Sequence, residues 1–307
     1  MNRNRIGRRI AYSLYSLCFG ISLLLFGYFV AISDPQALQK SYAIRFADPP
    51  SSSSGDPSGE AAVDVPSLIR SIPYNDGGTF YEVRSQDRIE MALRAGLGNC
   101  SNRVFGLAAY LSSIGKPYEI IHIMPLGSFL RGSGHTVIQL RYSFQGDDRE
   151  KIVDVDAGGI LVSDSRMVDF SLLSEMVARE GNVVSSIQLS NHRGFRPELY
   201  TDMLRGSVLG RVTSDEVGAY FRFVDFAYVR LGSPELERLV YNGLALVFGY
   251  YPWIYVGPLA KARVFAASGF RTNYILGRVF VLASRVLLAL SVVFPSAWLL
   301  KRSRSAG

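Results

Sequence analysis

Two long apolar runs near the ends of the chain dominate its pattern of hydrophobic and polar positions. The first covers residues 10–33 without a charge, and the second covers residues 279–300 and is interrupted only by Arg285. At about 1.5 Å per helical residue, both runs are long enough to cross the roughly 30 Å hydrocarbon layer of a bilayer. The pattern therefore predicts two transmembrane helices. A cleaved signal peptide is the alternative for the first run, but the run is longer than a usual signal core and no small-x-small cleavage site follows it.

Basic residues flank both runs on the side of the nearer terminus. They are Arg3, Arg5, Arg8 and Arg9 before the first run, and Lys301, Arg302 and Arg304 after the second. The positive-inside rule places such flanks in the cytoplasm. We therefore expect a basic cytoplasmic N-terminus at residues 1–9, a basic cytoplasmic tail at residues 301–307, and a main domain in the periplasm, anchored to a bacterial inner membrane.

A third stretch of membrane-like sequence precedes the second run. Residues 239–260 are uncharged but contain prolines and a Tyr-Tyr-Pro-Trp-Ile-Tyr cluster. Aromatic residues at this density favour the membrane interface over the bilayer centre. We therefore assign residues 236–278 to an interfacial or re-entrant segment. The alternative, a third membrane span, would force the basic C-terminal tail to the outside.

The remaining residues divide into a linker and a globular domain. Residues 34–78 include a stretch rich in Pro, Ser and Gly, residues 49–59, which has no apolar side chain to bury. Such a composition is typical of a flexible tether. From Thr79 the sequence becomes globular, and residues 79–235 form the predicted main domain.

A helix that begins near a cysteine opens the most informative part of this domain. Apolar residues recur at helical spacing over residues 104–111, shortly after Gly98 and Cys100. The glycine and proline within residues 115–117 end the pattern. Cys100 therefore stands at or near a helix N-terminus, where unpaired backbone N–H groups and the helix dipole stabilise a thiolate.

Three strands are predicted after this helix. Runs rich in β-branched and aromatic residues cover residues 118–124, 135–142 and 152–156. A glycine-containing loop, residues 125–134, separates the first two runs, and a turn at residues 145–148 separates the last two. The pattern predicts one helix followed by an antiparallel β-meander.

Side chains suited to thiol acyl transfer stand at the ends of these elements. Cys100 opens the helix, His135 opens the second strand, and Asp154 lies in the third. In this chemistry a thiolate attacks a carbonyl, an imidazole shuttles the proton, and a carboxylate holds the imidazole in its working tautomer. Asp156 points to the same strand face as Asp154. A tight turn at residues 145–146 would place Asp156 opposite His135, because the turn fixes the register of a hairpin.

Several short motifs follow one another in a fixed order. They are Gly98-x-Cys100 before a helix that contains Ala108 and Ala109, Gly115-x-Pro117 before a strand, His135 with the alternating Val137, Gln139 and Arg141, and the closing Asp154-Val155-Asp156-Ala157-Gly158. Over residues 97–161 this order resembles the core of the transglutaminase-like superfamily, within the papain-like thiol enzymes. The resemblance implies an α+β fold in which the helix that bears the cysteine packs on the antiparallel meander, here flanked by the two transmembrane helices.

The resemblance also implies a role for each candidate. Cys100 would be the nucleophile, and His135 would act first as base and then as acid. The closing motif favours Asp154, of the two aspartates, as the group that orients His135. The backbone N–H of Cys100 would be one oxyanion donor, and Asn99 and Gln139 are the candidates for the second.

The reaction implied by the resemblance is hydrolysis or transfer at an amide or peptide bond through an acyl-enzyme on Cys100. We therefore expect a cysteine peptidase, an amidase or an acyltransferase, with a peptide or protein of the cell envelope as substrate. Val137 and Val155 stand where family members commonly have an aromatic residue and a proline. The alternative is therefore a catalytically inactive module that binds a peptide or a cell-envelope assembly partner.

Composition and charge narrow the partners. The net charge of +7 and much of the 48 % hydrophobic content are concentrated in the predicted membrane segments and their flanks. This distribution favours a lipid bilayer as partner and argues against nucleic acid. No metal-ligand spacing, phosphate loop or dinucleotide motif occurs in the sequence, so we expect no metal and no cofactor. The sequence leaves the oligomeric state open.

The two cysteines support a functional thiol. Cys18 lies in the first apolar run and Cys100 in the main domain, so an internal disulfide is not expected. A single thiol in an oxidising compartment is unusual, because such compartments favour paired cysteines. The lone thiol of the main domain is best explained if the protein uses it.

Overall fold

A computed structural model of the chain describes most of the predicted main domain and part of the flanking sequence. The described residues are 13, 15–17, 19–21, 41–50, 100–128, 134–142, 146–179, 186–187, 197–227, 231–233, 236–237, 240–241, 244–245, 248, 252–267 and 270–304. The chain divides into two compact units. One unit comprises residues 43–228 and 252–271, and the other comprises residues 1–42, 229–251 and 272–307.

The first unit is built on a mixed β-sheet. Its described strands are β1 (Ile44–Phe46), β2 (Tyr118–Pro125), β3 (His135–Arg141), β4 (Glu150–Asp154), β5 (Gly159–Ser163), β6 (Arg166–Met167), β7 (Ser186–Ile187), β8 (Ser207–Thr213) and β9 (Ile254–Val256). Eight of them lie in the order β1-β9-β8-β2-β3-β4-β5-β6, and β7 pairs with β5. The pairing of β1 with β9 is parallel and the other described pairings are antiparallel.

The predicted helix and the predicted meander are both present in this unit. Helix α5, Cys100–Ser113, precedes β2, β3 and β4, which pair in sequence order. The sheet extends beyond the meander, because β8 adds to the free edge of β2 and is followed by β9 and β1. Two of these added strands come from sequence outside residues 79–235: β1 lies in the predicted linker, residues 34–78, and β9 lies in the predicted interfacial segment, residues 236–278.

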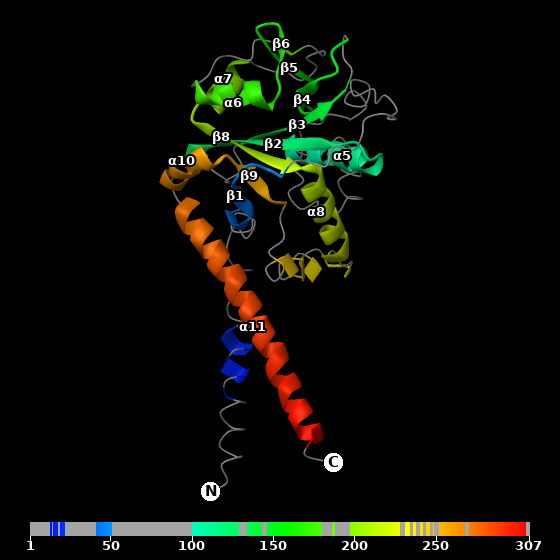
Figure 1. The fold of residues 1–307 in the computed structure, drawn as a ribbon, viewed down its shortest axis with the longest axis vertical. Coiled ribbons are helices and arrows are strands. Elements are labelled where there is room, and N and C mark those ends of the chain that lie inside the picture. The colour runs from blue at the N-terminus through cyan, green and yellow to red at the C-terminus, as the bar shows by residue number, and fades with distance from the viewer. Residues whose placement is uncertain are drawn as a thin grey trace. The chain divides into compact units, whose positions relative to one another are not determined.

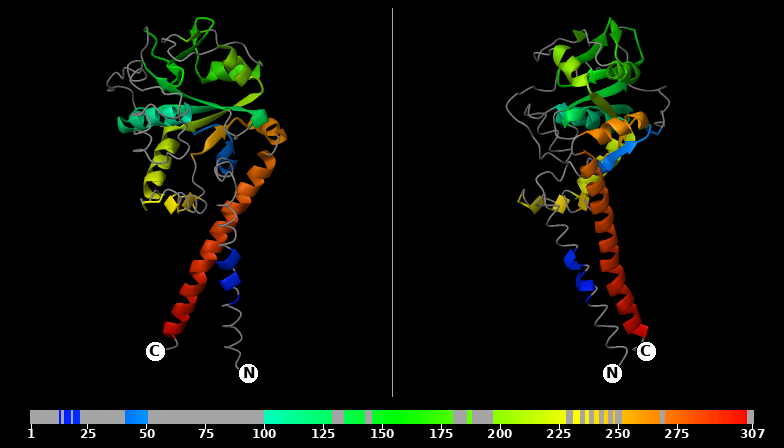
Figure 2. Two further views of the ribbon diagram at one scale, coloured as in Figure 1. Left: turned by 180° about the vertical axis from the view of Figure 1, so that it is seen from behind. Right: turned by 90° about the vertical axis from the view of Figure 1, so that its left-hand side faces the viewer.

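Helices cover both faces of the sheet (Figure 1). On one face lie α5 and α8, Ser214–Ala227, which contact each other through Phe105 and Phe221. On the other face lie α6, Phe170–Ala178, and α7, Pro197–Leu204. Figure 2 shows the same arrangement of this unit from behind and from the side. Three layers result, with the sheet in the middle.

The strand sequences match this three-layer arrangement. Successive side chains of a strand point to opposite faces, so Ile121 and Ile123 of β2 pack with α6 and α7 in one core. Tyr118 points the other way and its hydroxyl shares a hydrogen bond of 2.7 Å with Ser112 of α5. Because both faces are covered, β2 and β3 are rich in apolar residues at both alternating positions, as buried strands require.

The prediction of flanking transmembrane helices was wrong. Within the described part of the chain, no helix has the length and apolar character needed to cross a membrane. Helix α11, Phe270–Arg304, includes the second apolar run, which Arg285 interrupts, and a charge within a membrane span is costly. Most of the first run, residues 10–33, lies outside the described residues. The same finding overturns the predicted location in a bacterial inner membrane with both termini in the cytoplasm.

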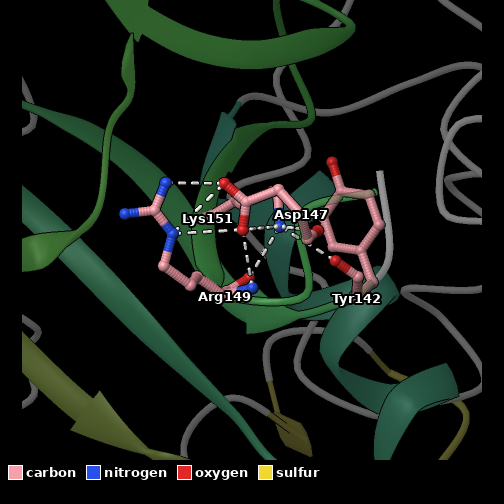
Figure 3. A network of polar contacts seen from close by, with 4 residues as sticks. All are labelled: Tyr142, Asp147, Arg149 and Lys151. Carbon is pink, nitrogen blue, oxygen red and sulfur yellow. Dashed lines mark hydrogen bonds and ion pairs between the residues drawn. The ribbon is translucent and has the colours of Figure 1, made fainter. Parts of the chain in front are cut away.

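A buried lysine fixes the turn between β3 and β4 (Figure 3). The side chain of Lys151 is fully buried, and its Nζ donates hydrogen bonds to three backbone carbonyls, those of Tyr142 (3.0 Å), Asp147 (2.6 Å) and Arg149 (2.8 Å). Burial lowers the pKa of Lys151, although the carboxylate of Asp147 acts in the opposite direction. The ammonium group therefore donates to the carbonyl groups on the inner side of this turn. This turn then sets the strand register that brings Asp154 close to β3.

We expect Lys151→Met to destabilise the fold by about 2 to 4 kcal/mol, because the substitution removes a fully buried side chain that donates three hydrogen bonds to backbone carbonyls. The free energy of unfolding from denaturant titration measures this loss. Arg149→Met is the matched control, because Arg149 lies in the same turn and pairs with Asp147 but is 80 % exposed. The control should change stability little. Equal effects of the two substitutions would show that the buried ammonium does not fix the turn.

Candidate active site

Three element ends converge in the first unit and bring the predicted site residues together. Cys100 is the first residue of α5, His135 is the first of β3, and Asp154 is the last of β4. The residues that follow Cys100 and His135 are also joined, because the hydroxyls of Ser101 and Thr136 share a hydrogen bond of 2.8 Å. This bond holds the start of the helix against the start of the strand.

His135 and Asp154 form a buried, hydrogen-bonded ion pair. The Nε2 of His135 lies 2.8 Å from Oδ2 of Asp154, and the aspartate side chain is only 1 % exposed. The other carboxylate oxygen, Oδ1, accepts the backbone N–H groups of Asp156 and Ala157, each at 2.9 Å. A buried charge requires such partners. Hydrogen bonds to both carboxylate oxygens therefore hold the aspartate side chain in place.

Tyr200 of α7 completes the environment of this aspartate. Its hydroxyl donates to Oδ2 of Asp154 at 2.5 Å, and its ring lies edge-on to the imidazole of His135 with a centroid distance of 5.5 Å. Tyr200 is almost fully buried, and burial followed by the charge of Asp154 raises the pKa of its hydroxyl well above the ordinary value. The phenol therefore stays protonated and remains a donor to the carboxylate.

Cys100 lies near the imidazole of His135. The imidazole of His135 and the backbone N–H of Thr136 both lower the pKa of the Cys100 thiol, so both groups lie close to the sulfur. Because Nε2 of His135 faces Asp154, the ring nitrogen available to the thiol is Nδ1. The sulfur therefore lies near the imidazole, and the imidazole is hydrogen-bonded to the carboxylate.

The electrostatics of the site favour the charged forms of all three groups. Burial raises the pKa of the Cys100 thiol, but the hydrogen bond and the charge of His135 and the N–H of Thr136 outweigh burial, so that the pKa lies below its ordinary value. Burial lowers the pKa of His135, but the charge and the hydrogen bond of Asp154 raise it well above 6.5. Asp154 has a lowered pKa, because His135 and the bonded donors outweigh the effect of burial. Both directions favour a thiolate beside an imidazolium.

The two aspartates that the sequence left as alternatives have different partners. Extending the observed β3–β4 register would place Asp156 opposite His135, as a tight turn predicts. However, β4 ends at Asp154, and a turn follows that includes a hydrogen bond from Gly158 N–H to the Asp154 carbonyl. Asp154 therefore reaches His135 diagonally across the strands, and Asp156 instead lies 3.5 Å from the guanidinium of Arg103.

The structure describes only one of the two candidates for the second oxyanion donor. Gln139 is used within the fold, because its Nε2 donates to Glu150 at 2.7 Å and its Oε1 accepts the backbone N–H of Phe170 at 2.6 Å. Asn99 lies outside the described residues. The backbone N–H of Cys100 is among the first N–H groups of α5, which have no acceptor within the helix.

Sequence reasoning missed three residues that line this site. Tyr200, Thr136 and Arg103 each contact or act on one of the three central side chains or on Asp156. The sequence could have pointed to Thr136 and Arg103, since each lies within three residues of a predicted site residue. Tyr200 had none, because α7 brings it to the site from far along the chain.

Metal chemistry and known relatives give no further assignment. Among the residues with described positions, no group of three or more His, Cys, Asp or Glu side chains could hold a metal ion. No family model, curated protein or solved structure matches the chain.

The geometry predicts the pH dependence of Cys100 alkylation. In the wild type, the rate with iodoacetamide should rise with an apparent pKa below the roughly 8.5 of an ordinary thiol. In His135→Ala the apparent pKa should rise, because burial then opposes the thiolate without the imidazolium to offset it. Asp154→Asn should fall between the two, since it keeps the imidazole and loses the charge behind it. A slow rate that is unaffected by replacing His135 would contradict the ion pair.

Removing the Tyr200 hydroxyl should destabilise the protein in a pH-dependent manner. The lowered pKa of Asp154 contributes stability that is present above the ordinary carboxyl pKa and is lost as the pH falls through the folded-state pKa. Tyr200→Phe weakens that shift, so it should cost about 1.5 to 3 kcal/mol near neutral pH. The cost should stay constant down to about pH 4 and become smaller as the pH falls below it.

The matched control for this experiment is Tyr118→Phe. Tyr118 is similarly buried, but its hydroxyl bonds the neutral Ser112. Its loss should cost about 0.5 to 1.5 kcal/mol with little change over the same pH range. The free energy of unfolding at each pH compares the two variants. A cost of Tyr200→Phe that does not depend on pH would show that the hydroxyl does not stabilise the ionised Asp154.

Proposed function

We propose that this chain is a transglutaminase-like thiol enzyme that breaks an amide or peptide bond through an acyl-enzyme on Cys100. The observation that carries the proposal is the buried pair of His135 and Asp154, with Cys100 near the imidazole and the aspartate held by Tyr200 and two backbone N–H groups. A structural thiol requires no imidazole partner, and a structural histidine requires no buried carboxylate behind it. The resemblance of residues 97–161 to the superfamily supports the same conclusion.

The acylation step follows from the positions of the side chains. The Cys100 sulfur attacks the carbonyl carbon of the substrate and forms a carbon–sulfur bond, and the electron pair of the carbonyl moves to its oxygen. His135 then gives its Nδ1 proton to the amide nitrogen, the carbon–nitrogen bond breaks, and the amine leaves. A thioester remains on Cys100, and Asp154 keeps the imidazole in the orientation that both proton transfers need.

The helix start provides a place for the developing oxyanion. The backbone N–H of Cys100 and the positive end of the α5 dipole both favour negative charge beside the sulfur. Donors fixed before the reaction begins stabilise the transition state without reorganisation. The N-terminal position of Cys100 therefore serves both the thiolate and the tetrahedral intermediate.

Deacylation reverses these roles. His135, now neutral, takes a proton from an attacking nucleophile, and the nucleophile adds to the thioester carbon as the carbon–sulfur bond breaks. Water gives a carboxylic acid, and the chain then acts as a cysteine peptidase or amidase. A primary amine gives a new amide, and the chain then acts as an acyltransferase. In both cases the thiolate and the imidazolium are restored.

The two residues that differ from the family pattern lie in the core. Val137 and Val155 are both fully buried, and Val137 packs in the apolar core with α6 and α7. Neither is one of the hydrogen-bonding partners of His135 or Asp154. The two differences therefore give no specific support to a catalytically inactive binding module, which becomes one of the outcomes of the test.

The test is to trap the acyl-enzyme. The full-length protein is incubated with glutamine-containing peptides and peptide anilides, quenched in acid and examined by intact-mass spectrometry. We expect an acyl adduct on Cys100 that hydroxylamine removes. Adding a fluorescent primary amine separates hydrolysis from transfer, since only transfer labels the peptide.

Variants of the site provide the controls. Cys100→Ala should form no adduct, and Asp154→Asn should form it roughly 10²- to 10⁴-fold more slowly, as in other triads that lose the orienting carboxylate. Gln139→Glu is not a suitable control, because Gln139 holds α6 and β4 together. Arg149→Met is suitable, since it lies in an exposed turn at the other end of β4. Peptide binding without an adduct in the wild type would support the binding module instead.

A further inference from the structure

The start of β3 contributes two successive side chains to the surroundings of the site. Successive side chains of a strand point to opposite faces of the sheet. His135 points to the side on which Asp154 and Tyr200 contact it, whereas Thr136 points to the side on which α5 packs. Thr136 is only 3 % exposed. A hydroxyl buried to this degree requires hydrogen-bonding partners.

The hydroxyl of Thr136 has partners on two different elements. It shares a hydrogen bond of 2.8 Å with the Ser101 hydroxyl of α5 and one of 3.1 Å with Nδ1 of His122 in β2. His122 is the residue that pairs directly with Thr136 between β2 and β3. A hydroxyl has one proton to donate and two lone pairs that accept, so it can make both bonds at once. The Thr136 hydroxyl therefore joins the helix to two strands of the sheet.

This junction lies one residue away from two members of the candidate site. Ser101 follows Cys100, and Thr136 follows His135. Neighbouring Cα atoms of a chain are about 3.8 Å apart. A hydrogen bond between Ser101 and Thr136 therefore restricts the separation of Cys100 and His135 to a narrow range. The placement of the nucleophile beside the imidazole thus depends on a bond that involves neither of these two side chains.

The backbone at the start of β3 is packed closely against β2. His135 pairs with Ile123 of β2, and a Cβ atom at Gly134 would collide with the carbonyl oxygen of Ile123. A glycine allows this close approach of two backbones. By contrast, a Cβ atom at Gly127, which lies in the same connection between β2 and β3, would meet no atom within 4 Å. The start of β3 is therefore a fixed support, to which Thr136 attaches the start of α5.

A second bond of the same kind holds the other end of α5. Ser112, in the last turn of the helix, shares a hydrogen bond of 2.7 Å with the hydroxyl of Tyr118 at the start of β2. Both ends of α5 are thus joined to the sheet by a pair of hydroxyls. One pair lies next to Cys100 and the other at the far end of the helix. Comparing the two pairs separates an effect on the position of the nucleophile from an effect on the packing of the helix.

We propose that Thr136 is a positioning residue for the nucleophile: its hydroxyl holds the first turn of α5 at the start of β3, so that the sulfur of Cys100 stays beside the imidazole of His135. The importance of this bond for catalysis rests on the proposed function. Its effect on the reactivity of Cys100 can be measured without a substrate.

The experiment measures the rate of Cys100 alkylation by iodoacetamide against pH in the full-length protein, with the modified peptide identified by mass spectrometry. At about pH 6.5, Thr136→Val should slow alkylation about two- to tenfold, the factor that corresponds to the net loss of one hydrogen bond. The difference should become smaller near about pH 10, where the thiol ionises without an imidazolium beside it. A general change in access to the sulfur would slow alkylation equally at every pH.

Two variants test whether the hydroxyl is responsible. Thr136→Ser keeps the hydroxyl and should retain a rate within about twofold of the wild type. Ser101→Ala removes the partner on the helix and should slow alkylation by a factor similar to that of Thr136→Val. The double variant should be no slower than Thr136→Val, because both substitutions remove the same bond.

Matched controls separate position from packing. Ser112→Ala breaks the equivalent bond at the far end of α5 and should lower the denaturation midpoint as Ser101→Ala does, but leave the alkylation rate unchanged. Gly134→Ala should slow alkylation, because the collision displaces the start of β3, whereas Gly127→Ala should not. If Thr136→Val does not fold, as judged by circular dichroism, Ser101→Ala is decisive, because it breaks the same bond from a half-buried position.

Three results would overturn the proposal. They are a wild-type rate in Thr136→Val, a rate in Thr136→Ser as slow as that in Thr136→Val, and an equal slowing by Ser112→Ala. The second result would mean that the shape of the side chain matters and not its hydroxyl, and the third that any loosening of α5 slows alkylation. A failure of the proposed function would be recognised separately, because the wild-type rate would then be unaffected by His135→Ala.

Discussion

The hydrogen-bonded ion pair between His135 and Asp154 is the interaction on which the rest of the site depends. A carboxylate as buried as that of Asp154 is stable as an anion only when its oxygens are satisfied, and it has four donors: the imidazole, the Tyr200 hydroxyl and two backbone N–H groups. The resulting negative charge raises the pKa of His135, and the charge of His135 in turn lowers the pKa of Cys100. Asp154 thus favours the charged form of His135, and His135 favours the charged form of Cys100.

The three-layer fold brings the side chains of the site together from different directions. Helix α5 brings Cys100 from one face of the sheet, and α7 brings Tyr200 from the other. The histidine and the aspartate stand at the ends of adjacent strands, so their separation is set by the β3–β4 register, which the buried Lys151 maintains at the opposite end of the hairpin. A change in that register would move the carboxylate away from the imidazole.

Local patterns predicted α5 and the meander, because helical spacing after Cys100 and β-branched runs are properties of short segments. They also predicted which residue types stand at the element ends. They could not distinguish Asp154 from Asp156, since the distinction depends on where β4 bends into its turn. Tyr200 was not predicted because only tertiary packing brings α7 to the site. The transmembrane prediction was wrong, because no helix in the described part of the chain has the length and apolar character to cross a membrane, and Arg285 interrupts the apolar run within α11.

The protonation state of His135 tests the account most directly, and ¹⁵N nuclear magnetic resonance of the imidazole measures it. The account predicts that both ring nitrogens carry protons at neutral pH, with Nε2–H bonded to Asp154 and Nδ1–H beside the Cys100 thiolate. Asp154→Asn should reduce the protonated fraction, because the charge that raises the pKa of His135 is lost. A neutral, singly protonated imidazole in the wild type at that pH would contradict the account, since Cys100 would then remain a thiol.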